Sequence, residues 1–265
     1  MISDSKSHIT LKANHLAIGY SSKKQNHPIK DHISFDVYKG ELVAIIGGNG
    51  IGKSTLLRTL AGLQPKLEGS IQILHKNISH YSPKELASHL SVVLTENITT
   101  KNLTALELIS LGRQPYTNWI GTLTKKDKDV ITTAIVQTGL EDLKDKKCYE
   151  LSDGQFQKVM IARALAQDTP IILLDEPTTH LDLYHTAQII KLLKDIAHKA
   201  QKTIVFTTHE INIALQLSDK ILILEKEATH YNTPSELIKT NCLDALFPND
   251  TIVFDPHTQS FKIKN

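Results

Sequence analysis

The chain has 265 residues, of which 40% are hydrophobic and 22% are charged, which is typical of a globular protein of one or two domains. Its net charge of +2 does not favour binding to nucleic acid or to anionic lipid. Cys148 and Cys242 lie far apart and lack metal-ligand spacing, which excludes a disulfide framework and indicates a reducing, cytosolic compartment. The N-terminus lacks an apolar signal core, and no apolar run is long enough to span a membrane. We therefore expect any membrane association to be peripheral.

The first part of the chain predicts antiparallel β structure. Ile33, Phe35 and Val37 alternate with the polar residues Ser34 and Asp36. This period of two is typical of a strand that buries one face.

A glycine-rich segment, GGNGIGKST, follows the apolar run at residues 42–46 and precedes a helical pattern. Its glycines let backbone N–H groups converge on an anion, and the helix N-terminus that follows adds a positive dipole end. Lys53 supplies a mobile positive charge, and the Ser54 hydroxyl can ligate Mg²⁺. The segment therefore predicts a phosphate-binding loop for a nucleoside triphosphate. Its residues are Gly47, Gly48, Asn49, Gly50, Ile51, Gly52, Lys53, Ser54 and Thr55.

The middle of the chain has a helical pattern. Thr104–Glu107 and Thr124–Asp127 each fit a capping box, and Gly112 and Gly139 are expected to end helices. We predict a helical insertion at about residues 97–150 that interrupts an α/β core.

Apolar runs at residues 171–174, 203–206 and 221–224 predict buried parallel strands of an α/β sheet. The first run ends in Asp175 and Glu176, at the sheet edge where the phosphate loop is also expected. Asp175 can hold Mg²⁺ directly or through water, and Glu176 can orient or deprotonate the water that attacks the γ-phosphate. The two motifs together predict an NTPase.

A further motif, Leu151-Ser-Asp-Gly-Gln155, lies just upstream of the acidic strand. By itself, Ser152-x-x-Gln155 also fits an ordinary capping box. In this order and spacing the motifs resemble those of the ATP-binding cassette (ABC) family, up to about Leu224. The resemblance implies one nucleotide-binding domain over residues 1–265. It would have an α/β P-loop core, an antiparallel β subdomain, the inserted helical subdomain, and a C-terminal extension from about residue 225 that includes a possible hairpin.

The resemblance also implies a dimer. Ser152, Gly154 and Gln155 match the signature, which in this family closes over ATP held by the phosphate loop of another subunit. Asp182 matches the D-loop. The implied assembly is two copies of this chain that share two sites for ATP and Mg²⁺.

Other matched positions have implied roles in ATP binding and hydrolysis. His209 matches the switch histidine that contacts the γ-phosphate and helps to position the attacking water, so Glu176 and His209 are the expected catalytic pair. Tyr20 matches the aromatic residue that stacks on adenine, and a surface or packing role for Tyr20 stays open.

Two positions depart from the family pattern. Glu96 stands where the glutamine of the Q-loop is expected; its carboxylate can ligate Mg²⁺ but cannot donate a hydrogen bond. We expect Glu96 to be a metal ligand and a coupling residue. Asp153 stands where the signature usually has glycine, and we expect its side chain to point away from the phosphates because two negative charges repel.

Within the family, Gly112-Arg-Gln-Pro-Tyr116 and the following Trp119 resemble the ATPases of importers for ferric siderophores, haem and vitamin B12. This implies a peripheral protein on the cytoplasmic face of the cell membrane, with a permease and, indirectly, an extracytoplasmic binding protein as partners. Tyr116 and Trp119 fit either a permease contact or the cover of the helical subdomain's own core. The sequence leaves the cargo open.

Two other functions fit the sequence less well than transport. A soluble regulatory ABC ATPase would be expected to show tandem cassettes or a long coiled coil, and the sequence shows neither. A P-loop kinase would have no use for the signature or for the switch histidine.

Overall fold

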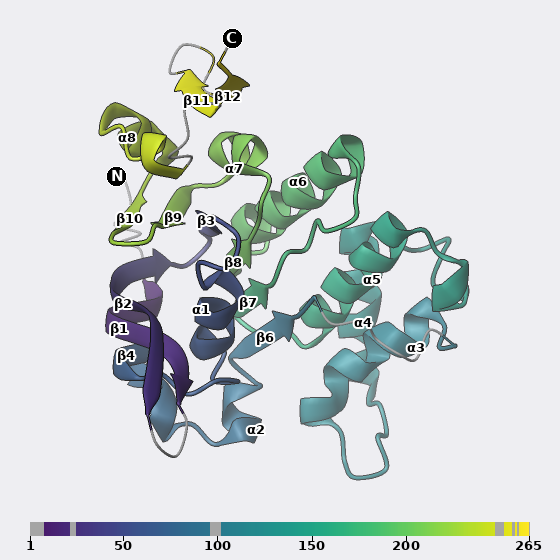
Figure 1. Ribbon diagram of the computed structural model, residues 1–265. Coiled ribbons are helices and arrows are strands. Elements are labelled where there is room, and N and C mark those ends of the chain that lie inside the picture. The colour runs from purple at the N-terminus through teal and green to yellow at the C-terminus, as the bar shows by residue number, and fades with distance from the viewer. Residues whose placement is uncertain are drawn as a thin grey trace, which may run out of the picture.

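The computed structural model describes residues 8–21, 25–95, 102–246, 252–255, 258 and 260–264. An antiparallel sheet, a mainly parallel sheet and a group of helices lie side by side (Figure 1). The helical group stands at the edge of the parallel sheet that is farther from the antiparallel sheet. These three parts match the α/β architecture with an antiparallel β part and a helical part that the sequence predicts.

The antiparallel sheet comes from the first part of the chain, as predicted. Ile33, Phe35 and Val37 are buried, whereas Ser34 is exposed and Asp36 is half-buried. The period of two therefore places one face of the strand in the core. In sheet order the strands are β2 (Asn26–Tyr38), β1 (Ile9–Ser21), β4 (Glu68–Ile73) and β5 (Lys76–Asn77).

The second sheet contains the apolar runs that predict parallel strands, and this prediction is confirmed. Strands β9, β3, β8, β7 and β6 run parallel, and β10 pairs antiparallel with β9. Their carboxyl ends consequently meet at one edge, where loops can bring polar groups together. In sheet order the strands are β10 (Thr229–Asn232), β9 (Lys220–Leu224), β3 (Leu42–Gly47), β8 (Thr203–Thr207), β7 (Ile171–Leu174) and β6 (Leu90–Val93).

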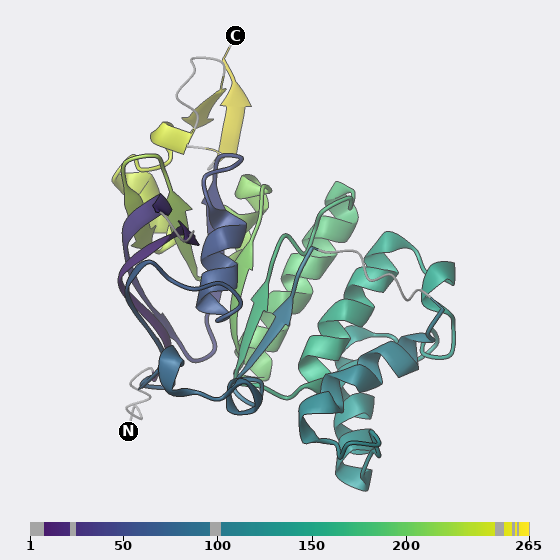
Figure 2. The same ribbon diagram turned by 60° about the horizontal axis from the view of Figure 1, so that its bottom comes forward.

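Strand β3 separates two apolar clusters. Val43 and Ile45 face the cluster that holds α1 (Lys53–Leu60) against the antiparallel sheet. Leu42, Ala44 and Ile46 face the cluster on the other side. Figure 2 shows α1 between the two sheets. This packing fixes the loop between β3 and α1, because both of its ends are buried.

The helical part confirms both predicted capping boxes, formed by Thr104 and Thr124. Gly139 ends its helix in the left-handed conformation, also as predicted. The α-helix Ala105–Ser110 also ends next to Gly112, with Leu111 as its C-cap, but the chain continues through Gly112 as a 3₁₀ helix instead of turning in the left-handed conformation. A Cβ at Gly112 would lie 2.3 Å from the carbonyl oxygen of Arg163, so close packing against the neighbouring helix requires the glycine.

The helices of this part pack against one another and cover one end of the sheet. The expected end of the helical subdomain near residue 150 stays a prediction. The elements are α3 (Ala105–Ser110), η2 (Leu111–Tyr116), α4 (Lys125–Thr138), η3 (Cys148–Glu150) and α5 (Asp153–Ala166).

The C-terminal part contains the expected hairpin, formed by β11 (Ile252–Asp255) and β12 (Ser260–Ile263). Among the residues described, no helix is both long enough and apolar enough to cross a membrane. The remaining elements are η1 (Ile78–His80), α2 (Pro83–Leu86), α6 (Leu183–Lys199), α7 (Ile211–Leu217), α8 (Pro234–Lys239) and η4 (Asp244–Leu246).

Candidate nucleotide-binding site

The glycine-rich loop leads from β3 into α1 and curls around the ammonium group of Lys53. The Nζ atom donates hydrogen bonds to the carbonyl oxygens of Gly47 (3.0 Å) and Gly48 (3.1 Å). Burial lowers the pKa of Lys53, and the charges of Glu176 and Asp175 oppose this shift. The loop therefore holds a positive group at the N-terminus of a helix, which is a suitable arrangement for a phosphate.

Two loop glycines adopt backbone conformations that favour glycine, and one of them is also closely packed. Gly52, which precedes α1, has a φ of 108°, and a Cβ there would lie 2.8 Å from Ile29. Gly50 has a φ of 72° and faces open space. Ile51 packs against the apolar cluster around α1, so its side chain anchors the loop.

Asp175 follows β7 and is almost fully buried, with 2% of its surface exposed. Its Oδ1 accepts a hydrogen bond from the Thr207 hydroxyl (2.8 Å), and its Oδ2 accepts one from Thr95 (3.1 Å). A carboxylate has further lone pairs that these bonds leave available. The carboxylate is therefore held in place and can still bind a hard cation such as Mg²⁺.

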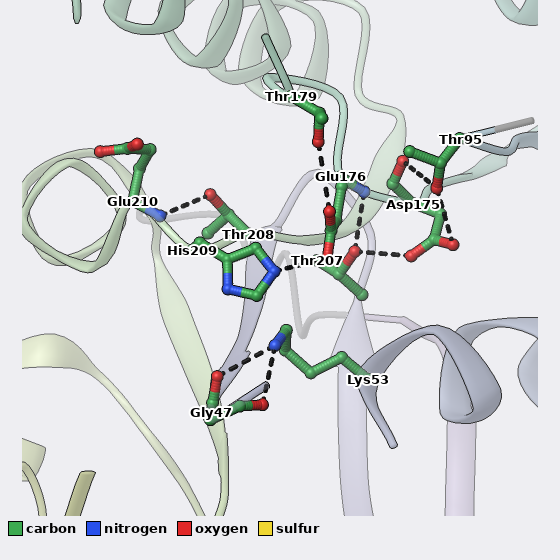
Figure 3. Close-up of polar contacts among 11 residues, drawn as sticks. Gly47, Lys53, Thr95, Asp175, Glu176, Thr179, Thr207, Thr208, His209 and Glu210 are labelled. Carbon is green, nitrogen blue, oxygen red and sulfur yellow. Dashed lines mark hydrogen bonds and ion pairs between the residues drawn. The ribbon is translucent and has the colours of Figure 1, made fainter. Parts of the chain in front are cut away.

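Glu176 and His209 come together at the same edge of the sheet, as Figure 3 shows. His209 Nε2 lies 2.6 Å from Glu176 Oε1, and the Thr179 hydroxyl donates to Glu176 Oε2 (3.2 Å). Both side chains are partly exposed. The carboxylate is thus oriented by two neighbours and remains accessible to water.

These groups surround a cleft of about 480 Å³. The loop and Lys53 form one wall, and Glu176 and His209 lie across from it. Tyr20, at the end of β1, has an exposed fraction of 59% and lines the same cleft. This exposure excludes a packing role in the core, and the adenine contact of Tyr20 stays a prediction beside a surface role. The cleft is lined by Tyr20, Ile29, Asn49, Gly50, Gly52, Lys53, Ser54, Thr55, Glu176 and His209.

None of the signature residues is among the residues that line this cleft. Ser152 caps α5, and the capping box that the sequence allows is formed with Gln155 (3.1 and 3.3 Å). Ser152 and Asp153 are exposed. A Cβ at Gly154 would lie 3.1 Å from the His185 ring, so the signature helix packs against the start of α6.

Asp182 is also exposed and caps α6. Its carboxylate accepts a hydrogen bond from the backbone N–H of His185 (2.8 Å), which lowers the pKa of Asp182. Asp182 does not line the cleft either. Glu96, the predicted metal ligand, lies outside the described residues.

The Gly-Arg-x-Pro element has an internal role that the sequence does not reveal. Arg113 has an exposed fraction of 4%, and its Nε donates to Asp127 Oδ1 (2.8 Å). Its guanidinium also donates to the carbonyl oxygen of Ala166 (3.0 Å) and stacks on the Tyr116 ring at 4.0 Å. Trp119 is 94% exposed. Arg113 therefore joins η2, α4 and α5, while Trp119 does not cover the helical core.

Sequence reasoning missed the threonines that hold the acidic residues, Thr95, Thr179 and Thr207. No motif marks them, although Thr207 is a polar residue directly after the apolar run 204–206, which is a weak signal.

The loop, the acidic strand end and the facing histidine define a P-loop nucleoside triphosphatase. Residues 30–179 match the family model described as ABC transporter, and the chain belongs to this family of ABC-type ATPases. An uncharacterized ABC transporter ATP-binding protein of Methanocaldococcus jannaschii is 37% identical over 96% of this chain and 87% of its own length.

An iron-chelate relative and a solved structure extend the comparison. The iron(3+)-hydroxamate import ATP-binding protein of Bacillus subtilis is 34% identical over 94% of this chain and 92% of its own length. A solved structure described as an inward-facing, metal-chelate type ABC transporter is 29% identical, with a TM-score of 0.78 over 96% of this chain and 95% of that one. The chain is thus similar over most of its length to ATPase subunits of import systems.

Proposed function

We propose that this protein is the ATP-hydrolysing subunit of an ABC importer that takes up an iron chelate through a membrane permease. The observation that carries the proposal is the cleft in which Lys53 faces Glu176 and His209. The relative that imports iron(3+)-hydroxamate supports an iron chelate as the cargo. Haem and cobalamin are the other cargoes that the sequence resemblance admits.

The chain's own residues suggest how ATP is handled. Lys53 can exchange its bonds with the Gly47 and Gly48 carbonyls for bonds to phosphate oxygens, and the backbone N–H groups of the loop supply further donors. Glu176 orients the attacking water and accepts its proton. His209 holds the Glu176 carboxylate in place through their short contact. These roles lead to hydrolysis at the γ-phosphate.

The donor set fits Mg²⁺. Ser54 lines the cleft, and the Asp175 carboxylate lies close enough to Lys53, on the cleft wall, to act on its pKa. Hard oxygen donors of these kinds suit Mg²⁺. When bound, Mg²⁺ neutralises charge on the phosphates. Glu96 stays the third proposed ligand.

We further propose that a second copy of the chain completes each site. Ser152, Gly154, Gln155 and Asp182 lie away from the cleft of their own chain, with Ser152 and Asp182 exposed. The exposed N-terminus of α5 can contribute a hydroxyl and backbone N–H groups to an anion held by another copy.

The proposed permease contact lies along α2 and η2. A hollow of about 740 Å³ is lined by Leu63, Tyr81 and Leu86, and Ala87 connects it to a second hollow beside Pro115. Leu63 is largely exposed, as is Trp119, which follows η2 and lines neither hollow. Apolar hollows with exposed anchor residues are suited to a helix of a partner protein. Such a contact would place the chain at the cytoplasmic face of the membrane, and the extracytoplasmic binding protein would act through the permease.

The first test is the rate of ATP hydrolysis by the purified chain and by Glu176→Gln. We expect kcat to fall at least about 100-fold in the variant, because the amide cannot accept the proton. ATP binding should persist, so that the variant elutes as a dimer in ATP and Mg²⁺. Wild-type hydrolysis by Glu176→Gln would refute the catalytic assignment.

The transport role is tested by co-purification with the permease. Leu63→Asp and Trp119→Asp should weaken co-purification while leaving the ATPase rate of the isolated chain unchanged. Val136→Asp, at an exposed apolar position on α4 and therefore outside α2 and η2, is the matched control. A chain that hydrolyses ATP but never associates with membranes would favour the soluble regulatory ABC ATPase instead.

A further inference from the structure

A single buried hydroxyl connects the two acidic residues of the site. Thr207, the last residue of β8, has an exposed fraction of 0%. Its Oγ1 lies 2.8 Å from Asp175 Oδ1 and 2.8 Å from the backbone nitrogen of Glu176. Figure 3 shows the hydroxyl between these two residues.

The chemistry of the groups fixes the direction of both bonds. An ionised carboxylate only accepts, so the Thr207 hydroxyl donates its hydrogen to Asp175. The backbone N–H of Glu176 only donates, so the same oxygen accepts from it. The hydroxyl thus uses its donor on one acidic residue and a lone pair on the next.

The bond to Glu176 restrains an unusual backbone. Glu176 has a φ of 46°, in the left-handed region that residues with a Cβ rarely adopt. Such a conformation persists only when the surroundings hold it. The Thr207 oxygen fixes the N–H of Glu176, and the Glu176 carbonyl accepts from the backbone of Thr179 (3.2 Å). This backbone conformation determines the direction in which the Glu176 side chain leaves toward His209.

A second buried threonine in the same strand shows that a hydroxyl there need not serve the site. Thr203, at the other end of β8, is also fully buried. Its hydroxyl contacts Thr10 (2.8 Å) and the carbonyl oxygen of Tyr38 (3.2 Å), next to the antiparallel sheet. Thr203 therefore offers a matched control: the same residue type, strand and burial, but no acidic partner.

We propose that Thr207 is a positioning residue for ATP hydrolysis. Its hydroxyl fixes the Asp175 carboxylate and the backbone of Glu176 together, so that the metal-binding and water-activating groups keep one relative geometry. Because His209 follows two residues later, the same segment also carries the group that contacts Glu176. The inference rests on the proposed roles of Asp175 and Glu176.

The test compares Thr207→Val, Thr207→Ser and Thr203→Val in the full chain. Valine keeps the shape of threonine and removes the hydroxyl, whereas serine retains it. We expect Thr207→Val to lower kcat at least about tenfold, with KM for ATP changed by less than about twofold, because the phosphate loop is untouched. Thr207→Ser should restore most of kcat, and Thr203→Val should keep the wild-type value. Equilibrium binding of ATP should be the same for all variants.

Wild-type kcat in Thr207→Val would overturn the proposal, as would an equal loss in Thr203→Val or no recovery in Thr207→Ser. If Thr207→Val does not fold, Thr207→Ala removes the same hydroxyl with less bulk and is subject to the same outcomes. Glu176→Gln, measured in parallel, separates the two inferences. If that variant is inactive while Thr207→Val is normal, only the role of Thr207 fails; if Glu176→Gln is active, the proposed catalytic site itself is wrong.

Discussion

Asp127 shows how one residue can link a helix cap to a buried ion pair. Its carboxylate accepts hydrogen bonds from the Thr124 hydroxyl (2.6 Å) and backbone N–H (2.8 Å), as well as from Arg113 (2.8 Å). These bonds lower the pKa of Asp127 from 3.8 to about 2. The bonds from Thr124 are the main cause, and Arg113 contributes. The charged form of Asp127 therefore stabilises the folded chain.

The sign of the pH dependence follows from this shift. Because the folded-state pKa lies below the unfolded value, the stabilisation is complete above about pH 4 and is lost as the pH falls toward about 2. We expect the difference in unfolding free energy between wild type and Asp127→Asn to be constant from pH 7 to pH 5 and to shrink below pH 4. Urea unfolding at several pH values measures it, with the exposed Asp129→Asn as the control. A difference that does not depend on pH would mean that the loss comes from packing alone.

The residues that could be predicted are those in contiguous motifs. Lys53, Asp175 and Glu176 stand in segments whose order and spacing carry the chemistry. Thr207 could not be found this way, because its partner Asp175 lies 32 residues away and a threonine in a strand is ordinary. The buried role of Arg113 was hidden for the same reason, since Ala166 lies 53 residues from it.

At the level of elements, the helical part depends on a buried charge rather than on apolar packing alone. Arg113 is enclosed between η2, α4 and α5. It donates hydrogen bonds to the Asp127 carboxylate and to the carbonyl oxygen of Ala166, the last residue of α5. Removing one member of a buried pair leaves the other without its partner in a region of low dielectric constant. The arginine of the Gly-Arg-x-Pro element therefore holds η2 against α4 and α5.

Arg113→Met should lower the free energy of unfolding by about 3–5 kcal/mol. Lys199→Met removes an exposed pair with Asp195 on α6 and should cost at most about 0.5 kcal/mol. Urea denaturation of both variants measures the contrast. A loss below about 1 kcal/mol for Arg113→Met would show that the helices hold together without the arginine.

Elements were predictable where the signals are local. Capping boxes at Thr104 and Thr124, the left-handed Gly139 and the apolar runs of the parallel strands depend on neighbouring residues in the sequence. The end of α3 next to Gly112 was predictable in the same way, but the close contact that requires a glycine there was not, because it involves Arg163 on a helix that comes later in the chain. Local patterns do not contain that information.

At the scale of the whole molecule, the signature is separate from the cleft of its own chain. Lys53 lies in the cleft, whereas Ser152 is exposed at the N-terminus of α5 and does not line it. If a second copy supplies its signature to this cleft, each site combines Lys53 of one chain with Ser152 of the other. Two variants with separate defects can then complement each other.

Lys53→Ala should prevent ATP binding to its own chain, and Ser152→Arg should leave ATP binding intact while blocking only the site that this residue enters, so each variant alone is inactive. In an equal mixture, random pairing makes about half of the dimers mixed, and each mixed dimer has one intact site. We expect the mixture to recover at most about a quarter of the wild-type rate, measured as phosphate release at fixed total protein. If the signature instead acted within its own chain, every site in the mixture would carry one of the two defects. The mixture would then stay as inactive as its components, whatever the dimer content, so the recovered rate separates a shared site from a site made within one chain.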